Sequence, residues 1–244
     1  MCAKTYPSNT SLAGGTKCMP QWFIAIYTRN RGFYFYAYNP IRNRWHAVPM
    51  GQFLPEPIVS IGSFILCRVA ASSPLQLSLC NPFTKQYQFL PQLQTLRTNP
   101  AVGVVTYGDG TFKVNVAGGM SQGPKGGNAF YEPTLEMYES RVDKCKSLGR
   151  IPIEFAVRLT VWTQNDSVYY MGVLYWITSA RAYNVMGYEV ESGEWKELKI
   201  PMSDKLEFAA LVRRKGRLVL VGGGACIDGE AWIWELGRGY TGVC

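Results

Sequence analysis

The chain has 244 residues, of which 47% are hydrophobic and 17% charged, so it can bury a sizeable core and lacks the composition of a disordered protein. The net charge of +8 is compatible with an acidic partner, but the Lys and Arg residues are dispersed, which favours an ordinary basic soluble protein. The 25 glycines and 14 prolines, scattered between apolar runs, indicate many short strands joined by turns and argue against a helical fold.

The first residues are not expected to act as a signal peptide. Residues 1–20 are polar and rich in Gly, Ser and Thr, which predicts a disordered tail or a linker remnant before a β domain over 21–244. The seven cysteines include no Cys-x-x-Cys pair, so reduced thiols in a cytoplasmic or nuclear protein are expected. The best membrane candidate, 58–71, is interrupted by Gly62 and Arg68, so no membrane partner is expected.

From residue 21 onwards, short apolar runs alternate with turn signals and predict strands in five successive units. The expected strands cover 22–27, 33–38, 64–69, 75–80, 101–107, 112–117, 134–138, 168–171, 173–178, 185–189, 208–213, 217–221 and 231–236. The run 33–38 has bulky residues on both faces, which predicts a strand sandwiched between two sheets. The one helical candidate, 135–145, is assigned to strands because it shares the spacing of the repeat described next.

A strand end, a turn and a new strand recur four times with the same spacing. The two marker residues of each copy lie seven positions apart, as in Tyr38/Trp45, Cys80/Tyr87, Tyr138/Cys145 and Tyr188/Trp195. The second markers are separated by 42, 58 and 50 positions, a period that predicts a repeat architecture. We expect Trp45 and Trp195 to be buried between neighbouring sheets, each against the tyrosine seven residues before it.

A strand that ends in Gly-Gly, a loop, a strand that ends in tyrosine and a later tryptophan resembles the kelch repeat. Val116-Ala-Gly-Gly119 and Val221-Gly-Gly-Gly224 match its first half, and the Tyr/Trp pairs match its second half. The structural markers of this resemblance are Tyr38, Trp45, Tyr87, Gly118, Gly119, Tyr138, Tyr188, Trp195, Gly222 and Gly223. The Asn-Pro turn with a following Pro, as in Asn39-Pro40, is similar to plant F-box/kelch-repeat proteins.

The resemblance implies an all-β, kelch-type β-propeller with about five blades visible and an incomplete ring. The first unit is expected to lack an inner strand and the last its outer strand, which would leave exposed strand edges. In that family an N-terminal F-box recruits the Skp-type adaptor of a cullin ubiquitin ligase, and the propeller selects the protein to be ubiquitinated. No Leu-Pro-led F-box precedes Trp22, so we expect a truncated or differently spliced member, with adaptor binding only where an F-box lies upstream.

The residues required for catalysis, metal binding or cofactor binding are missing from the pattern. His46 is the only histidine, which argues against a zinc site, a Ser-His-Asp triad and the histidine-ligated copper of kelch-type oxidases. The Gly-rich segment 118–128 lacks the Gly-Lys-Ser/Thr ending of a phosphate-binding loop. A non-catalytic protein-binding module without cofactor is therefore expected. The alternative is an RNA- or anion-binding surface driven by the positive charge, with nucleic acid the less favoured partner because most aromatics lie in predicted strands.

The binding surface is predicted on the loops between the second and third strands of each unit, because these loops vary while the turns between third and fourth strands are uniform. We expect one basic face that accepts an acidic protein segment. Its predicted residues are Arg29, Arg31, Lys125, Arg181 and Tyr183 on these loops, together with Arg97 on a connection between successive units.

Overall fold

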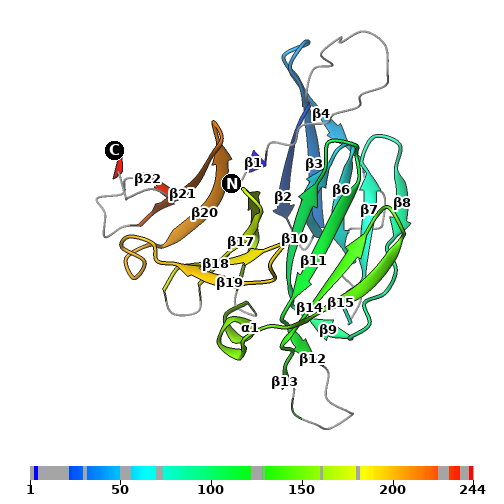
Figure 1. Ribbon diagram of the computed structural model, residues 1–244. Helices are drawn as coiled ribbons and strands as arrows, with labels where there is room; N and C mark the ends of the chain where they lie inside the picture. The colour runs from blue at the N-terminus through cyan, green and yellow to red at the C-terminus, as the bar shows by residue number, and fades with distance from the viewer. Residues whose placement is uncertain are drawn as a thin grey trace. The chain divides into compact units, whose positions relative to one another are not determined.

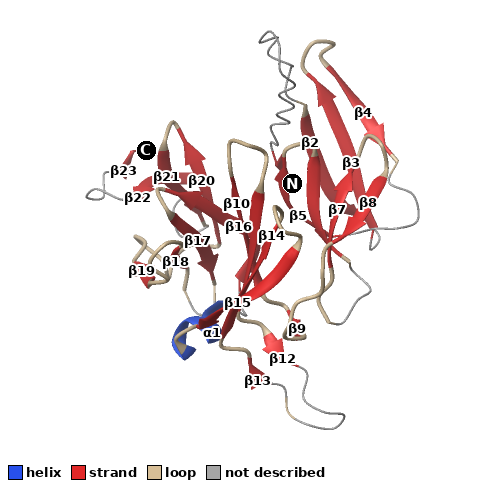
Figure 2. Cartoon of the chain, turned by 45° about the vertical axis from the view of Figure 1, so that its right-hand side comes forward, coloured by secondary structure: helices blue, strands red, loops and turns tan. Residues whose placement is uncertain are grey.

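The computed structural model describes residues 3–4, 22–29, 32–49, 56–69, 74–121, 128, 130–159, 162–179, 182–224, 231–236 and 242–243. Within these ranges the chain is almost entirely β-strand, with a single helix (Figures 1 and 2). It divides into two compact units, Met1–Gln92 and Leu93–Cys244. The predicted all-β fold class is confirmed, as five four-stranded antiparallel sheets whose strands pair as blades of a propeller do.

The first unit contains the first two sheets. The first sheet consists of β1 (Ala3–Lys4), β2 (Phe23–Arg29), β3 (Gly32–Asn39) and β4 (Arg44–Val48), paired in that order. The second sheet consists of β5 (Glu56–Ile61), β6 (Phe64–Arg68), β7 (Leu77–Asn81) and β8 (Gln86–Phe89). The two sheets share a core in which Phe35 and Ala37 of the first lie with Ile65 and Cys67 of the second.

The second unit contains three further four-stranded sheets. The third sheet is β10 (Ala101–Thr106), β11 (Phe112–Ala117), β14 (Thr134–Glu139) and β15 (Lys144–Arg150). The fourth is β16 (Trp162–Tyr170), β17 (Val173–Thr178), β18 (Asn184–Glu189) and β19 (Trp195–Leu198). The fifth is β20 (Phe208–Arg214), β21 (Arg217–Gly223), β22 (Ala231–Leu236) and β23 (Gly242–Val243). Their first strands make contact in succession, β10 with β16 and β16 with β20, as the inner strands of adjacent blades do.

The seven-residue spacing in the sequence has a direct structural cause. In all four copies the two marker residues are cross-strand partners: Tyr38 with Trp45, Cys80 with Tyr87, Tyr138 with Cys145 and Tyr188 with Trp195. In each copy the residue five positions after the first marker lies in the left-handed region, at Asn43, Lys85, Asp143 and Gly193. The first markers also reach this residue, because the hydroxyls of Tyr38 and Tyr138 donate to Asn43 and Asp143 at 2.6 and 2.9 Å.

The Asn-Pro turns owe their shape to the asparagine. The Asn39 side-chain oxygen accepts the amide protons of Ile41 and Arg42, and Asn81 does the same for the amides of Phe83 and Thr84. Each asparagine thereby replaces the backbone partners that the chain loses when it leaves the ladder. The Asn-Pro signal in the sequence therefore marks the same four-residue turn twice.

The Gly-Gly marker of the third sheet is explained by close packing. Gly118 and Gly119 have φ angles of 66° and 96°, a region that favours glycine. A Cβ atom on Gly119 would lie 2.7 Å from the Thr98 carbonyl oxygen, and one on Gly118 would lie 3.3 Å from that of Ala156. Gly222 and Gly223 end β21 in the fifth sheet, where both are buried.

The fourth sheet is buried on both faces. Every residue of β17 is buried, and alternate side chains enter different cores. Leu174 and Trp176 pack with residues of the third sheet, whereas Tyr175 and Ile177 pack with Leu211 and other residues of the fifth. A strand buried on both faces was expected in this fold, but it is β17 that shows this clearly.

Several expectations require correction. The strand over 33–38 is not buried on both faces, because Phe35 lies in the core while Tyr34 is 43% exposed. Trp45 contacts Tyr38 at a ring-centroid distance of 5.2 Å but is 54% exposed, so its predicted burial is wrong. Trp195 contacts Tyr188 at 5.0 Å and is half-buried.

The end sheets and one helix also differ from the prediction. β1 pairs with β2, and β23 pairs with β22, so the first and last sheets each have the fourth strand that the pattern lacked. The rest of the predicted tail, 1–20, lies outside the described residues. The helix α1 (Ile153–Leu159) was not predicted, nor was the small sheet of β9 (Arg97–Thr98), β12 (Met120–Ser121) and β13 (Phe130–Tyr131).

Candidate protein-interaction site

Arg97 was predicted on the binding surface but is fully buried in the second unit. It forms an ion pair with Glu136 and donates to the backbone oxygens of Gly118 and Thr134 at 3.1 and 2.9 Å. Glu136 in turn accepts the amides of Gln94 and Thr95 at 2.6 and 2.9 Å. Arg97 therefore fixes the segment 94–98 to the third sheet and is removed from the predicted surface. A charge fully paired in this way is a structural element rather than a free contact.

Of the remaining residues predicted for the binding surface, the structure describes the side chain of Tyr183 alone. Tyr183 is half-buried, its hydroxyl donates to the Glu207 backbone oxygen at 3.0 Å, and it packs against the core between the fourth and fifth sheets. The side chains of Arg29, Arg31, Lys125 and Arg181 lie outside the described part of the structure. The predicted basic loop surface thus remains a prediction for these four arginine and lysine residues.

The charge is distributed very unequally between the two units. The first unit, 1–92, has eight Lys and Arg residues and one acidic residue, Glu56, for a net charge of +7. The second unit, 93–244, has 17 basic and 16 acidic residues, for a net charge of +1. Almost the whole excess charge of the protein therefore belongs to the first unit, an asymmetry that the whole-chain composition does not reveal.

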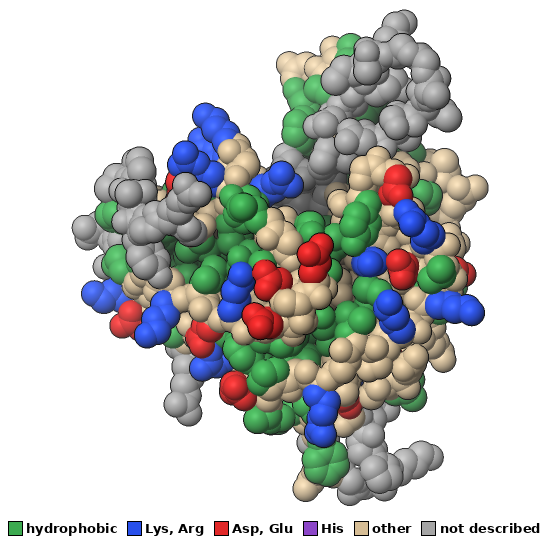
Figure 3. Space-filling model, viewed as in Figure 1, with side chains coloured by type: hydrophobic (Ala, Val, Ile, Leu, Met, Phe, Trp, Pro, Cys, Tyr) green, Lys and Arg blue, Asp and Glu red, His purple; other side chains and the backbone are tan. Residues whose placement is uncertain are grey.

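Several basic side chains of the second unit have acidic partners. Figure 3 shows Lys and Arg side chains interspersed with Asp and Glu on the face in view. Exposed or half-exposed ion pairs join Arg141 to Asp109 at 2.7 Å, Arg158 to Glu197 at 2.6 Å and Arg217 to Glu235 at 2.5 Å. Such pairs balance the charge of this unit locally and add little stability.

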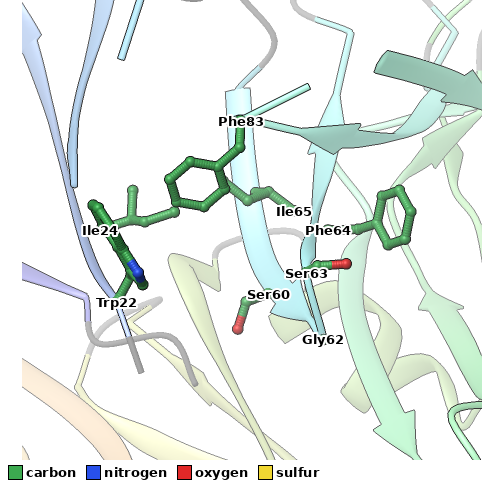
Figure 4. A pocket seen from close by; sticks show the side chains of 8 residues that line it. All are labelled: Trp22, Ile24, Ser60, Gly62, Ser63, Phe64, Ile65 and Phe83. Atoms are coloured by element: carbon green, nitrogen blue, oxygen red, sulfur yellow. The ribbon is translucent and has the colours of Figure 1, made fainter. Parts of the chain in front are cut away.

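A small aromatic cavity lies within the first unit, between the start of β2, the β5–β6 turn and the β7–β8 turn. We call it the aromatic notch; its walls are Trp22, Ile24, Ile65 and Phe83, with Ser60 and Ser63 beside them, and it encloses about 290 Å³ including its open mouth. Figure 4 shows the Phe83 ring reaching toward Ile24 and Trp22, while Phe64 points away from them.

The rings of the aromatic notch hold one another in place. Trp22 meets Phe83 edge to face at a centroid distance of 5.5 Å and interplanar angle of 74°. On β4, His46 lies 5.8 Å from the Trp22 ring. The single histidine of the chain therefore supports an aromatic cluster, and half of the Phe83 surface remains exposed.

A second cavity lies at the equivalent end of the third sheet. It encloses about 470 Å³ and is lined by Tyr107, Asp109, Thr111, Phe112, Lys113, Glu139 and Arg141. Its charges are satisfied internally: Arg141 pairs with Asp109, and Lys113 lies 3.8 Å from Glu139 and 5.6 Å from the Tyr107 ring. Hydrogen bonds from the Thr111 hydroxyl and amide hold the pKa of the exposed Asp109 carboxyl below its usual value, so it stays ionised.

Each cavity lies at the end of its sheets where turns join the first strand to the second and the third strand to the fourth. The aromatic notch is bounded by the β5–β6 and β7–β8 turns, and the second cavity by the β10–β11 and β14–β15 turns. These are the opposite ends from the variable loops chosen in the sequence analysis. The uniform turns were not chosen as the binding surface, although one of them carries the exposed aromatic Phe83.

Of the described cysteines, Cys67 and Cys80 are buried and Cys145 is half-buried. Burial raises the pKa of the Cys67 and Cys80 thiols, and burial with nearby carboxylates raises that of Cys145, so all three stay protonated near neutral pH. Among the described residues, no group of three or more His, Cys, Asp or Glu side chains is placed to hold a metal ion. Likewise, none of the described helices has the length and apolar character needed to cross a membrane.

No protein-family model matches the chain. A comparison with curated proteins finds similarity to "F-box only protein 6" of Arabidopsis thaliana, at 26% identity over 226 residues. The aligned region covers 88% of this chain but 44% of the relative, so the chain spans less than half of the protein it matches. Over nearly its whole length, then, this chain is similar to part of a plant F-box protein.

Proposed function

We propose that this chain is a non-catalytic protein-binding propeller of the kelch type, and that it forms the target-recognition part of an F-box ubiquitin-ligase receptor. The observation that carries the proposal is the similarity to an F-box protein over 88% of the chain. The four-stranded sheets of each unit supply a scaffold, and the aromatic notch supplies a concave surface at one end of the first unit.

In this proposal the chain contributes recognition, and partner subunits contribute chemistry. A Skp-type adaptor would be engaged through an F-box upstream of this chain, and no cofactor would be required. The receptor would act in the cytoplasm, the nucleus or both.

A second candidate function is binding of RNA or another polyanion. The observation that favours it is the +7 charge of the first unit, which would attract any anionic partner at low ionic strength. A nuclease treatment separates the two candidates, since a protein target survives it and an RNA-mediated complex does not.

The proposed function is tested by fusing the F-box region of the Arabidopsis relative to this chain and reconstituting the fusion with a Skp adaptor, cullin and ubiquitin enzymes. Proteins captured by the tagged chain after nuclease treatment should be ubiquitinated by the fusion but not by the F-box region alone. Capture that disappears with nuclease, or captured proteins that the fusion never modifies, would contradict a role in target recognition.

A further inference from the structure

We infer that the aromatic notch binds an apolar side chain carried by an acidic peptide segment of the target protein. The inference rests on the proposed protein-binding function and assigns it a site and a peptide chemistry. It places recognition at the turn end of the first unit rather than on the variable loops.

The apolar side chain of the bound peptide is inferred from the walls of the aromatic notch. Trp22, Ile24, Ile65 and Phe83 form an apolar lining, and Phe83 is 50% exposed at its mouth. The volume of about 290 Å³ includes open solvent, so the enclosed space is far below that of a small-molecule pocket, and a bound side chain would lie partly on the exposed Phe83 ring at the mouth. The Ser60 and Ser63 side chains offer hydroxyl groups beside it for the backbone of the bound segment.

The acidic character of the bound peptide is inferred from the position of the one carboxylate side chain in the first unit. Glu56 pairs across the strands with Arg68, at the far end of the hairpin whose turn borders the notch. The turn begins after Ile61, five residues further along β5, so Glu56 is roughly 16 Å away along the strand. The end of this unit that carries the notch therefore has no acidic side chain to compete for a positive charge.

Two basic residues lie next to the walls of the aromatic notch in the chain. Lys85 is exposed in the same turn as Phe83, two positions further on. Arg44 alternates with His46 on β4, so both side chains leave the same face of the strand, and the His46 ring lies 5.8 Å from Trp22. An acidic residue on either side of the apolar anchor would find these two cations, and the +7 field of the unit would speed its association.

The ring geometry favours a peptide over a nucleic acid. Stacking platforms for single strands need exposed aromatic faces, whereas Trp22 is already in contact with both His46 and Phe83. The lining contains two serines but no Asn, Gln or Arg side chain to read a base edge.

The test is to select peptides of about twelve residues from a random phage-displayed library on the full chain, then measure Kd for synthetic fluorescent versions by polarisation. The selected peptides should share an apolar residue flanked by Asp or Glu. Phe83→Ala, Lys85→Glu and Arg44→Glu should each weaken binding about fivefold or more. Lys85→Glu should also reduce the salt dependence of Kd.

The second unit offers matched controls. Phe208 is as exposed as Phe83, at 50%, and Arg213 is an exposed arginine, so Phe208→Ala and Arg213→Glu should leave Kd unchanged. Peptides without an acidic excess, equal binding by the notch variants, or failure to select any peptide would overturn the inference while the ubiquitination assay still judges the proposed function. Binding of a random single-stranded RNA that the same variants abolish would also overturn it, in favour of an RNA site.

Discussion

The first and fourth sheets carry the same hairpin in different surroundings. Tyr38 and Trp45 meet at 5.2 Å and 46°, and Tyr188 and Trp195 meet at 5.0 Å and 44°. Yet Trp45 is 54% exposed, whereas Trp195 is covered by Trp176 at 5.9 Å and by Phe155 of α1 at 5.8 Å. The turn and the strand register therefore determine the Tyr/Trp contact within each hairpin, while the neighbouring element determines how deeply the tryptophan is buried.

The middle strands of the two sheets differ in the same way. In β17 all residues are buried, because the third and fifth sheets cover its two faces. In β3, Phe35 and Ala37 are buried and Tyr34 is 43% exposed. Strongly apolar strands occur in both places, so hydrophobicity alone does not distinguish a strand covered on two faces from one covered on a single face.

The largest expected effect comes from the covered strand. Trp176 is 1% exposed and stacks on Trp195, so Trp176→Ala should destabilise the protein by about 3–5 kcal/mol through lost burial and the cavity left behind. Tyr34→Ala on β3 should cost about 1 kcal/mol or less, because much of that side chain is already in water. Denaturant unfolding of both variants measures this contrast, and equal losses would show that the two strands are covered alike.

Replacing the marker tryptophans Trp195 and Trp45 should give a smaller difference in stability between the covered and the exposed position. Trp195→Ala removes contacts to Tyr188, Trp176 and Phe155 and should cost about 2 kcal/mol, less than a fully buried tryptophan. Trp45→Ala should cost about 1 kcal/mol, mainly the aromatic pair with Tyr38. Fluorescence should agree, with greater quencher access to Trp45 than to the half-buried Trp195, when each is compared with its Trp→Phe variant. A Trp45 as protected as Trp195 would contradict the exposed position of β4.

Local features of the fold could be predicted from the sequence, because they are encoded in residues close together in the chain. The spacing of Tyr38 and Trp45 fixed a cross-strand pair, and Asn39-Pro40 marked its turn. The helix α1 was not predicted, although Pro152 stands directly before it and its carbonyl accepts the amides of Phe155 and Ala156.

Features that depend on distant partners could not be predicted. Arg97 seemed a surface residue because its partner, Glu136, is 39 positions away and nothing in the sequence couples them. The aromatic notch joins residues from three strands and two turns, so its walls are adjacent only after two sheets have folded together. The concentration of charge in the first unit was readable from the sequence, once the boundary between the units was known.

The smallest expected effect concerns the turn itself, where the two sheets should behave alike. Asn43 and Gly193 occupy equivalent left-handed positions, with φ angles of 47° and 77°. Asn43→Ala removes the acceptor of the Tyr38 hydroxyl. Alanine also adopts the left-handed region less readily than asparagine, so this variant should lose about 1 kcal/mol of stability. In Gly193→Ala the new Cβ meets only the Tyr188 hydroxyl oxygen, at 3.9 Å, so backbone strain alone should cost a similar ~1 kcal/mol. Asn43→Gly, which relieves the strain but not the lost hydrogen bond, should fall between Asn43→Ala and the parent chain in denaturant unfolding. If Gly193→Ala lowers the free energy of unfolding by several kcal/mol more than Asn43→Ala, the stability of the turn depends on the burial of its sheet. The conclusion that turn and register act independently of the neighbouring element would then be wrong.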